Sequence, residues 1–234
     1  MKQTILITGA ARGLGYCLSK KYLEEGNIVF AGVRDTKAPK LMALKEEYPE
    51  TLIPIELEVT DTLSIQQAAE TVEKYTDKLD ILINNAAIHS ETSFLNLEQA
   101  NIDECLQVYD VNCVGPMRVA KAFVHILRRS PSAKIINISS ESGSISTCTR
   151  EKEFDYCMSK AALNMGTKLL ANYLKKDNID VLCVQPGWMR TDMGGSNAML
   201  DPYETACQLI KVFESRNDLE QPIFINNDGS EFPW

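Results

Sequence analysis

Short apolar runs alternate with longer amphipathic stretches along all 234 residues of the chain, and this alternation constrains the fold most strongly. The apolar runs predict strands near residues 3–8, 27–33, 51–57, 79–84, 133–139, 179–185 and 222–225. Helical periodicity predicts helices near 13–25, 38–48, 62–76, 98–128, 154–176 and 201–215, with N-caps at Asp61, Asp103 and Asp201. Strands joined through crossover helices run parallel, so the sequence predicts an α/β fold, a doubly wound parallel sheet of about seven strands with helices on both faces.

Composition limits the organisation of the chain and the kind of partner it binds. The chain is 44% hydrophobic and has no Pro-, Gly- or Ser-rich linker, so we expect one domain over residues 1–234. The net charge of -8 argues against a nucleic acid or a membrane surface as partner. No signal peptide or membrane-spanning run is visible, and the seven cysteines are not arranged in Cys-x2-Cys pairs. We therefore expect a cytoplasmic protein without a metal site.

The first predicted strand leads directly into a glycine-rich turn, Gly9-Ala10-Ala11-Arg12-Gly13-Leu14-Gly15, which precedes a helical stretch. Glycines allow a tight turn and a close backbone approach, and a helix N-terminus offers free N–H groups and a partial positive charge. This combination favours a pyrophosphate site. The alternative is an ordinary β-to-α connection that binds no ligand.

Ligands of open parallel sheets lie beyond the carboxyl ends of the strands, so the residues that follow each strand are the informative ones. The second strand is followed by Arg34 and Asp35. Arg34 and Arg12 together could bind the 2′-phosphate of NADP through bidentate hydrogen bonds, which favours NADPH over NADH. Asp35 leaves NAD(H) open, because a shift of one residue would present a carboxylate to the ribose instead.

Small and polar residues follow the later strands. The runs are Asn84-Asn85-Ala86-Ala87, Ser139-Ser140-Glu141-Ser142-Gly143 and Gln185-Pro186-Gly187-Trp188-Met189-Arg190-Thr191-Asp192. Each run taken alone is ordinary turn chemistry. Their joint order, with one run after each of three successive strands, is not explained by turn chemistry alone.

Tyr156 and Lys160 lie four residues apart on a predicted helix, a spacing that stacks a phenol and an ammonium group on one helical face. A free phenol titrates near about 10, and a nearby cation stabilises the phenolate and lowers that value. Tyr156 is therefore a candidate proton donor. The pair taken alone is also compatible with a partly exposed aromatic beside a solvated lysine.

Taken together, these motifs make the chain resemble the short-chain dehydrogenase/reductase family, in the group of smaller members similar to the C-factor and sniffer-type carbonyl reductases. The resemblance covers essentially the whole chain and rests on the turn at 8–15, the run at 84–87, Asn112, Ser140, Tyr156 with Lys160, and Pro186-Gly187 followed by Thr191. Residues 185–195 and 228–234 point to the subgroup. It implies a Rossmann-type fold that binds NADP(H), and a homodimer or homotetramer.

The resemblance also implies roles for individual residues. Ser140 and Tyr156 would hydrogen-bond a substrate carbonyl, and Lys160 would lower the pKa of Tyr156 and hold the nicotinamide ribose. Asn112 would interrupt a long helix and bind a water that links Lys160 to solvent. Cofactor contacts are implied for Gly9, Ala11, Arg12, Gly13, Leu14, Gly15, Arg34, Glu58, Val59, Asn85, Ala86, Ala87, Tyr156, Lys160, Pro186, Gly187, Met189 and Thr191.

Three positions require a choice or depart from the family pattern. Ser140 is preferred to Ser139 because the family serine stands three residues before the glycine, here Gly143. Ala87 replaces a glycine, and Glu58 replaces an aspartate near the adenine. Both changes bear on cofactor affinity and leave the reaction type intact.

The sequence therefore predicts an NADPH-dependent oxidoreductase that transfers hydride to the carbonyl of a small aldehyde or ketone, or oxidises the corresponding alcohol. Substrate contacts are expected from His89, Ser142 and Trp188 in the surrounding loops. One alternative is a catalytically idle NADP(H)-binding sensor on the same fold. A second alternative is an NAD-dependent alcohol dehydrogenase.

Overall fold

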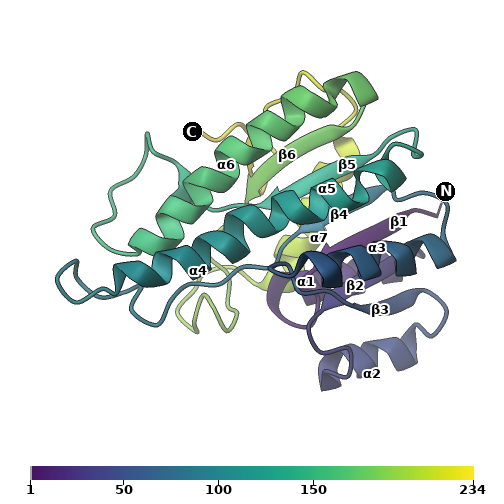
Figure 1. Ribbon diagram of the computed structural model, residues 1–234, viewed down its shortest axis with the longest axis horizontal. Coiled ribbons are helices and arrows are strands. Elements are labelled where there is room, and N and C mark those ends of the chain that lie inside the picture. The colour runs from purple at the N-terminus through teal and green to yellow at the C-terminus, as the bar shows by residue number, and fades with distance from the viewer. Residues whose placement is uncertain (1) are drawn as a thin grey trace.

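The computed structural model describes residues 2–234 and contains a seven-stranded parallel sheet in the order β3-β2-β1-β4-β5-β6-β7 (Figure 1). The two halves of the sheet grow outward in opposite directions from β1 and β4. The predicted strands are confirmed to within two residues at each end. They are β1 (Thr4–Thr8), β2 (Ile28–Val33), β3 (Leu52–Glu56), β4 (Ile81–Asn84), β5 (Lys134–Ile138), β6 (Asp180–Gln185) and β7 (Phe224–Asn226).

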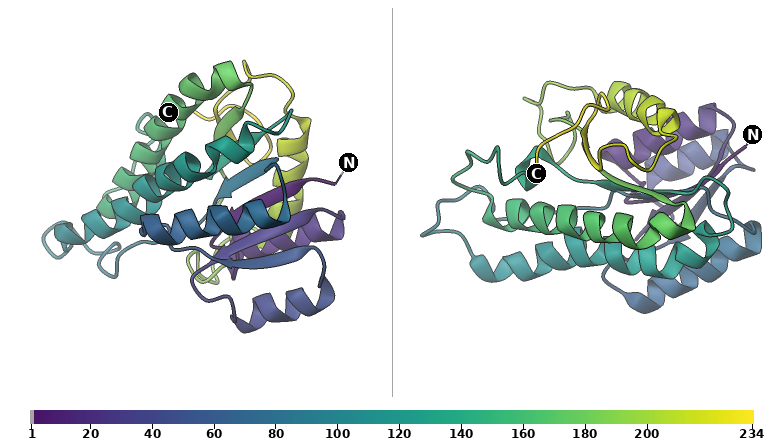
Figure 2. Two further views of the ribbon diagram at one scale, coloured as in Figure 1. Left: turned by 45° about the vertical axis from the view of Figure 1, so that its right-hand side comes forward. Right: turned by 90° about the horizontal axis from the view of Figure 1, so that it is seen from above.

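Helices cover both faces of the sheet, as the two views in Figure 2 show. One face carries α1 (Gly13–Glu24), α2 (Pro39–Glu47) and α7 (Pro202–Ser215), and the other carries α3 (Thr62–Tyr75), α5 (Gly115–Leu127) and α6 (Phe154–Leu174). Successive strand residues serve opposite faces, so Ile5 and Ile7 pack with α1 and α7 whereas Leu6 packs with α3 and α5. This double burial explains why the strands are continuous apolar runs.

The helix predicted over 98–128 is not continuous. Its first turn is a 3-10 helix, η1 (Ile102–Glu104), followed by α4 (Cys105–Tyr109), a π-helical turn η2 (Asp110–Val114) and then α5. Asn112 lies within the π-helical turn and is buried. The expectation that a long helix is interrupted at Asn112 is therefore confirmed.

Two of the three predicted N-caps are confirmed. The Asp61 carboxylate accepts from the N–H of Leu63, and that of Asp201 accepts from the N–H groups of Tyr203 and Glu204. The prediction for Asp103 was wrong, because the side chain of Asn101 accepts from the N–H of Asp103 and caps η1. Asp103 lies inside the first turn of that helix, where a carboxylate still interacts favourably with the helix dipole.

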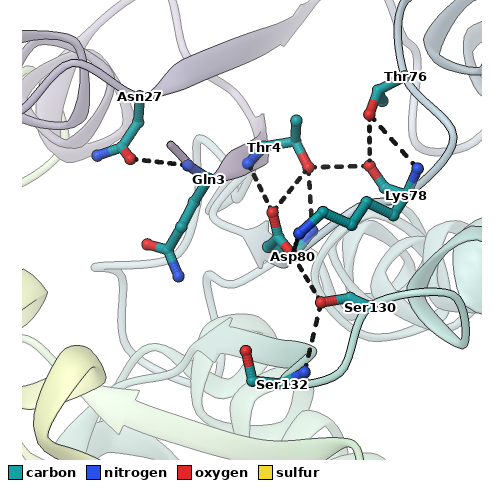
Figure 3. A network of polar contacts seen from close by, with 8 residues as sticks. All are labelled: Gln3, Thr4, Asn27, Thr76, Lys78, Asp80, Ser130 and Ser132. Atoms are coloured by element: carbon teal, nitrogen blue, oxygen red, sulfur yellow. Dashed lines mark hydrogen bonds and ion pairs between the residues drawn. The ribbon is translucent and has the colours of Figure 1, made fainter. Parts of the chain in front are cut away.

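The amino end of the sheet is held by a buried carboxylate, Asp80, which precedes β4 (Figure 3). Its two oxygens accept from the N–H and hydroxyl of Thr4, the ammonium of Lys78 at 2.7 Å and the hydroxyl of Ser130 at 2.6 Å. Burial alone would raise the pKa of Asp80, but these hydrogen bonds outweigh it and hold the pKa below its ordinary value. The network joins β1, β4 and the segment before β5 at one point.

Candidate active site

The predicted site residues gather at the carboxyl end of the sheet, where the loops after β4, β5 and β6 project from the left side of Figure 1. The N-terminal end of β1 lies on the opposite side of the molecule. The parallel sheet therefore brings together segments that lie far apart in the sequence.

The glycine turn packs against the end of β4. The hydroxyl of Thr8 accepts from the N–H groups of Asn85 at 3.0 Å and Ala86 at 3.1 Å, and the Asn85 amide donates to the Thr8 carbonyl at 2.9 Å. Gly9 has a φ of +69°, and a Cβ there would lie 2.9 Å from the Cα of Ala86. Only glycine fits this approach. Ala87, which replaces the family glycine, is half-buried next to this contact.

The N-terminus of α1 offers N–H groups without a capping side chain. Arg12 stands at the N-cap and makes no side-chain cap bond, and Gly13, Leu14 and Gly15 begin the helix. A Cβ on Gly13 would lie 3.6 Å from Thr191, so this turn faces the loop that follows β6. This is the donor arrangement that binds a pyrophosphate.

Arg12 and the residues after β2 have different side-chain partners in the structure. The Arg12 guanidinium pairs with Asp192 at 3.3 Å, whereas the Arg34 Nε lies 4.0 Å from a Glu58 oxygen, and both arginines are exposed. The Asp35 carboxylate accepts from the N–H of Lys37 at 2.9 Å, and the other Glu58 oxygen accepts from Thr60. Both guanidinium groups remain accessible at the cofactor edge, but their convergence on a phosphate stays a prediction. Val59 lies beside Glu58, and a Cβ on Gly115 would lie 3.0 Å from it.

The two serines after β5 have different surroundings. Ser139 is buried and donates to the side-chain oxygen of Asn164 at 2.6 Å. Ser140 is only half-buried, begins the 3-10 turn η3 (Glu141–Gly143), and accepts from the N–H of Ser142 at 3.1 Å. Its hydroxyl also lies close enough to Tyr156 to lower the pKa of the phenol. The geometry therefore favours Ser140 over Ser139 as the residue that meets a substrate.

Close packing between η3 and α6 fixes the Ser140 turn beside Tyr156. A Cβ on Gly143 would lie 2.8 Å from the backbone of Lys160, and the Asn164 amide donates to the Gly143 carbonyl at 3.0 Å. Ser142 is buried in this turn and receives a hydrogen bond from Ser140 at 3.1 Å. It thus supports Ser140, and it is too buried to offer much contact to a substrate.

Lys160 is buried in α6, and its ammonium group donates to the Ile138 carbonyl at 2.8 Å. The ammonium lies 5.4 Å from the centre of the Tyr156 ring, so the predicted stacking on one helical face is confirmed. Removal from water lowers the pKa of Lys160 to about 8.

The phenol of Tyr156 does not show the lowered pKa expected from that pairing. Burial raises the pKa of Tyr156 to about 12, and the hydroxyl of Ser140 opposes this rise. Lys160 points toward Ile138 instead of the phenol oxygen, so its charge does little for the phenolate. Tyr156 accordingly keeps its proton at neutral pH.

Asn112 connects the end of β4 to α6. Its side-chain oxygen accepts from the N–H of Ile88 at 2.8 Å, while its amide donates to the Ile88 carbonyl at 2.7 Å and to the Ser159 hydroxyl at 3.0 Å. Both amide hydrogens are therefore used by the protein. The predicted link from Asn112 through a water to Lys160 remains a prediction.

The loop after β6 forms the far side of the site. Pro186 is buried and Gly187 has a φ of +85°. The Thr191 hydroxyl accepts from the N–H of Gly194 at 3.1 Å, and the Thr191 N–H donates to the Met189 carbonyl at 2.9 Å. The indole of Trp188 is 56% exposed and donates to the Gly194 carbonyl, so its ring is available to a ligand.

His89 lies on the loop after β4. Its ring contacts the Ser90 carbonyl at 3.0 Å and packs edge-on against Phe94 at 5.3 Å. Among the described residues, no hydrogen bond joins His89 to Tyr156 or Ser140. Across the same residues, no group of three or more His, Cys, Asp or Glu side chains is placed to hold a metal ion.

Sequence reasoning did not foresee the contribution of Arg150. Its guanidinium forms ion pairs with Glu141 and Glu153, and it lies close enough to Tyr156 to lower the pKa of the phenol against the larger effect of burial. Nothing in the local sequence marks Arg150, because its partners and the phenol meet only once η3 packs against α6.

Comparison with known proteins decides the family. A family model described as short chain dehydrogenase matches residues 3–199. The chain belongs to the short-chain dehydrogenase family. In the fold, the glycine turn, the Asn85 segment and the start of the Tyr156–Lys160 helix all lie at the carboxyl end of the sheet.

Solved structures of family members cover the whole chain. The carbonyl reductase Sniffer of D. melanogaster is 30% identical with a TM-score of 0.94 and matches 100% of both chains. The NADPH-bound carbonyl reductase from chicken fatty liver is 30% identical with a TM-score of 0.91, covering 100% of this chain and 99% of that one. C-signal of Myxococcus xanthus is 30% identical over 68% of this chain and 95% of its own length. These similarities place the chain near the predicted subgroup.

Proposed function

We propose that this oxidoreductase is an NADPH-dependent carbonyl reductase with Tyr156 as its acid. The observation that carries the proposal is the pair of neighbouring hydroxyl groups, Ser140 and Tyr156, at the carboxyl end of the sheet beside Lys160. Support comes from the carbonyl reductases that match the whole chain, one of which contains NADPH.

The residues at the carboxyl end of the sheet fit a dinucleotide. The uncapped N-terminus of α1 and the glycines at its start, Gly13 and Gly15, suit a pyrophosphate. We propose that Val59, Ala86 and Ala87 border the adenosine half, and that Pro186, Gly187, Met189 and Thr191 border the nicotinamide half. The bound nicotinamide would supply hydride to the substrate carbonyl carbon.

Ser140 and Tyr156 would donate hydrogen bonds to the carbonyl oxygen, where negative charge develops during reduction. The pKa of about 12 means that Tyr156 carries its proton at neutral pH and can give it to this oxygen. Lys160 would hold the nicotinamide ribose. Asn112 would fix the loop at Ile88 against α6, which keeps Tyr156 in place.

The charges after β2 support NADPH over NADH. Arg34 is exposed, while the Asp35 carboxylate is turned to the N–H of Lys37 and Glu58 is held by Thr60. Arg34 and Arg12 can therefore offer guanidinium groups to a 2′-phosphate. Arg34→Ala should weaken NADPH by roughly 1.5 to 3 kcal/mol and change NADH little, as measured by titration with both cofactors. Equal loss for both would show that the phosphate is not bound there.

The activity is tested by NADPH and NADH consumption with purified protein and a panel of aldehydes, ketones, diketones and quinones. NADPH-dependent reduction of at least one class is the expected result. Tight NADPH binding with no turnover across the panel would instead favour the idle sensor, and a preference for NADH with alcohols would favour an NAD-dependent alcohol dehydrogenase.

We also propose that the protein forms a homodimer through α4 and α6, or a homotetramer that contains this interface. These helices lie side by side on one face, and apolar residues on them are exposed, including Leu106, Met165 and Leu169 at 61% or more. Adjacent exposed apolar side chains of this size favour association. Leu169→Glu should shift the mass measured by light scattering toward the monomer.

A further inference from the structure

Helix α6, which carries Tyr156, begins without the usual cap. Its N-cap residue, Glu153, makes no side-chain cap bond and has a φ of +62°, a left-handed conformation that is strained for a residue with a side chain. Tyr156 lies in the first turn of this helix, where backbone N–H groups have no acceptors within the helix. Helix ends fray unless other contacts hold them, so the position of the phenol depends on what holds this turn.

The carboxylate of Asp155 joins this turn to the segment after β4, residues 88–93, which we call the β4 loop. One oxygen of Asp155 accepts from the Ser90 N–H at 2.7 Å, and the other accepts from the Ser93 hydroxyl at 2.7 Å. The Ser93 carbonyl in turn accepts from the N–H of Glu153 at 2.8 Å. These three hydrogen bonds, which we call the Asp155 clamp, connect the start of α6 to two serines of the β4 loop.

The Asp155 clamp is buried and tightly packed. Asp155 is 4% exposed and Ser93 is 3% exposed. A cavity of about 10 Å³ lies beside Ser90, Ser93 and Asp155, which leaves room for one water at most. Burial alone would raise the pKa of Asp155, but the hydrogen bonds from Ser90 and Ser93 outweigh it and hold the pKa below its ordinary value. The carboxylate is therefore charged at neutral pH, and hydrogen bonds to a charged acceptor are the stronger kind.

A second link joins the same two segments one turn further along α6. The Asn112 amide donates to the Ile88 carbonyl at 2.7 Å and to the Ser159 hydroxyl at 3.0 Å. The Ser159 hydroxyl donates to the backbone carbonyl of Tyr156 at 2.8 Å. Tyr156 lies between Asp155 and Ser159 in the sequence, so the backbone of α6 is attached to the β4 loop on both sides of the phenol.

We propose that Asp155 is a positioning residue for Tyr156, and that its carboxylate takes the place of the missing cap of α6 and holds the phenol beside Ser140. An acid contributes to proton transfer only when it lies within hydrogen-bonding reach of the reacting oxygen, so a first turn that opens costs turnover. The effect on turnover rests on the proposed reductase function, whereas the effect on the position of the phenol does not. The two effects are therefore tested by different measurements.

The position of the phenol is tested by fluorine NMR of the protein labelled with 3-fluorotyrosine, with the Tyr156 signal assigned from Tyr156→Phe. Asp155→Ala should shift or broaden this signal beyond its linewidth. It should also speed amide exchange at Ser90 by about tenfold or more, because the Ser90 N–H loses its acceptor. Asp155→Asn should restore both, because the asparagine oxygen can accept from Ser90 while its nitrogen donates to the Ser93 hydroxyl. An unchanged Tyr156 signal in Asp155→Ala would overturn the proposal.

Asp80→Ala is the matched control, because it also removes a buried, hydrogen-bonded carboxylate but lies at the amino end of the sheet. It should change neither the Tyr156 signal nor the exchange at Ser90, and an equal change in this control would overturn the proposal. Ser93→Ala removes a single bond of the Asp155 clamp. It should shift the Tyr156 signal in the same direction by less, and it decides the question if Asp155→Ala does not fold.

The effect on turnover is tested with NADPH and butane-2,3-dione as the probe. Asp155→Ala should lower kcat about tenfold and leave the KM for NADPH within about twofold, because the acid is displaced while the cofactor site is not. Asp155→Asn should recover most of the lost kcat, and Asp80→Ala should keep it. An unchanged kcat in Asp155→Ala would overturn the positioning role. Absence of turnover by the wild-type protein across the carbonyl panel would overturn the proposed function, and the NMR signal of Tyr156 would still decide whether Asp155 holds the phenol.

Discussion

At the amino end of the sheet, the buried carboxylate of Asp80 is surrounded by donors from Thr4, Lys78 and Ser130. At the carboxyl end, Ser140 and Tyr156 are both half-buried, and the Ser140 hydroxyl lies close enough to the phenol to lower its pKa. The first arrangement satisfies a charge fully and stabilises the fold. The second leaves donors in place for a substrate oxygen, so polar groups at the two ends of one sheet serve different purposes.

The largest effect is expected at the carboxyl end, from Lys160→Met. It removes a buried ammonium beside Tyr156 but keeps the side-chain volume, so the fold should survive. NADPH-dependent kcat/KM should fall by about 10²-fold, because the side chain proposed to hold the nicotinamide ribose is lost and the cofactor is no longer positioned. The matched variant Lys168→Met, on the exposed side of the same helix, should keep its activity. A loss in both variants would show that the helix, not the ammonium at the site, is responsible.

At the amino end, Asp80→Asn should reduce the free energy of unfolding by about 1.5 to 3 kcal/mol, because charge-assisted hydrogen bonds are lost in a buried place. The turnover of the folded enzyme should be unchanged. Urea titration of Asp80→Asn against Asp77→Asn, an exposed carboxylate in the same segment, measures the difference. If Asp80→Asn lost activity without losing stability, the amino end of the sheet would not serve stability alone.

We also expect the stabilising effect of Asp80 to depend on pH. The folded-state pKa of Asp80 lies below its ordinary value of 3.8, so its contribution is present above that value and is lost as pH falls through the folded-state pKa. The stability difference between the wild type and Asp80→Asn should therefore be constant from pH 7 to about 5 and shrink below about 4. Urea midpoints across this range provide the measurement. A difference that grows on acidification would contradict the sign.

Smaller effects are expected from the two serines that follow β5 at the carboxyl end, and they distinguish the structural serine from the catalytic one. Ser139→Ala removes the hydrogen bond to Asn164 and should cost about 1 to 2 kcal/mol of stability, while turnover remains. Ser140→Ala should keep stability and lose turnover. Thermal unfolding and kcat, measured for both variants, decide which serine belongs to the chemistry. The reverse pattern would restore Ser139 as the candidate.

Much of the fold was predictable from the sequence, because strands that are buried on both faces appear in the sequence as continuous apolar runs. Asp103 was misjudged as a cap because Asn101, two residues earlier, serves equally well and local sequence cannot rank them. The pKa of Tyr156 could not be predicted from its spacing to Lys160. The Lys160 ammonium group donates to the Ile138 carbonyl and so points away from the phenol oxygen, and the local sequence does not show this. The Ser146 hydroxyl donates a hydrogen bond to the backbone oxygen of Trp234, 88 positions along the chain, and no local sequence pattern predicts this bond.

Within residues 2–234, no helix combines the length and apolar character needed to cross a bilayer. The candidate catalytic residues lie at the carboxyl end of the sheet. Its residues come from loops after β1, β2, β4, β5 and β6, and only the shared parallel direction of these strands brings them together.

The most direct test of the central claim is NADPH binding and turnover measured on one preparation of Tyr156→Phe, with Tyr173→Phe on the exposed side of α6 as its control. We predict that Tyr156→Phe binds NADPH as the wild type does, unfolds at the same urea concentration, and loses turnover by about 10²-fold or more, because only the transferable proton is missing. Turnover within tenfold of the wild type would contradict the assignment of Tyr156 as the acid.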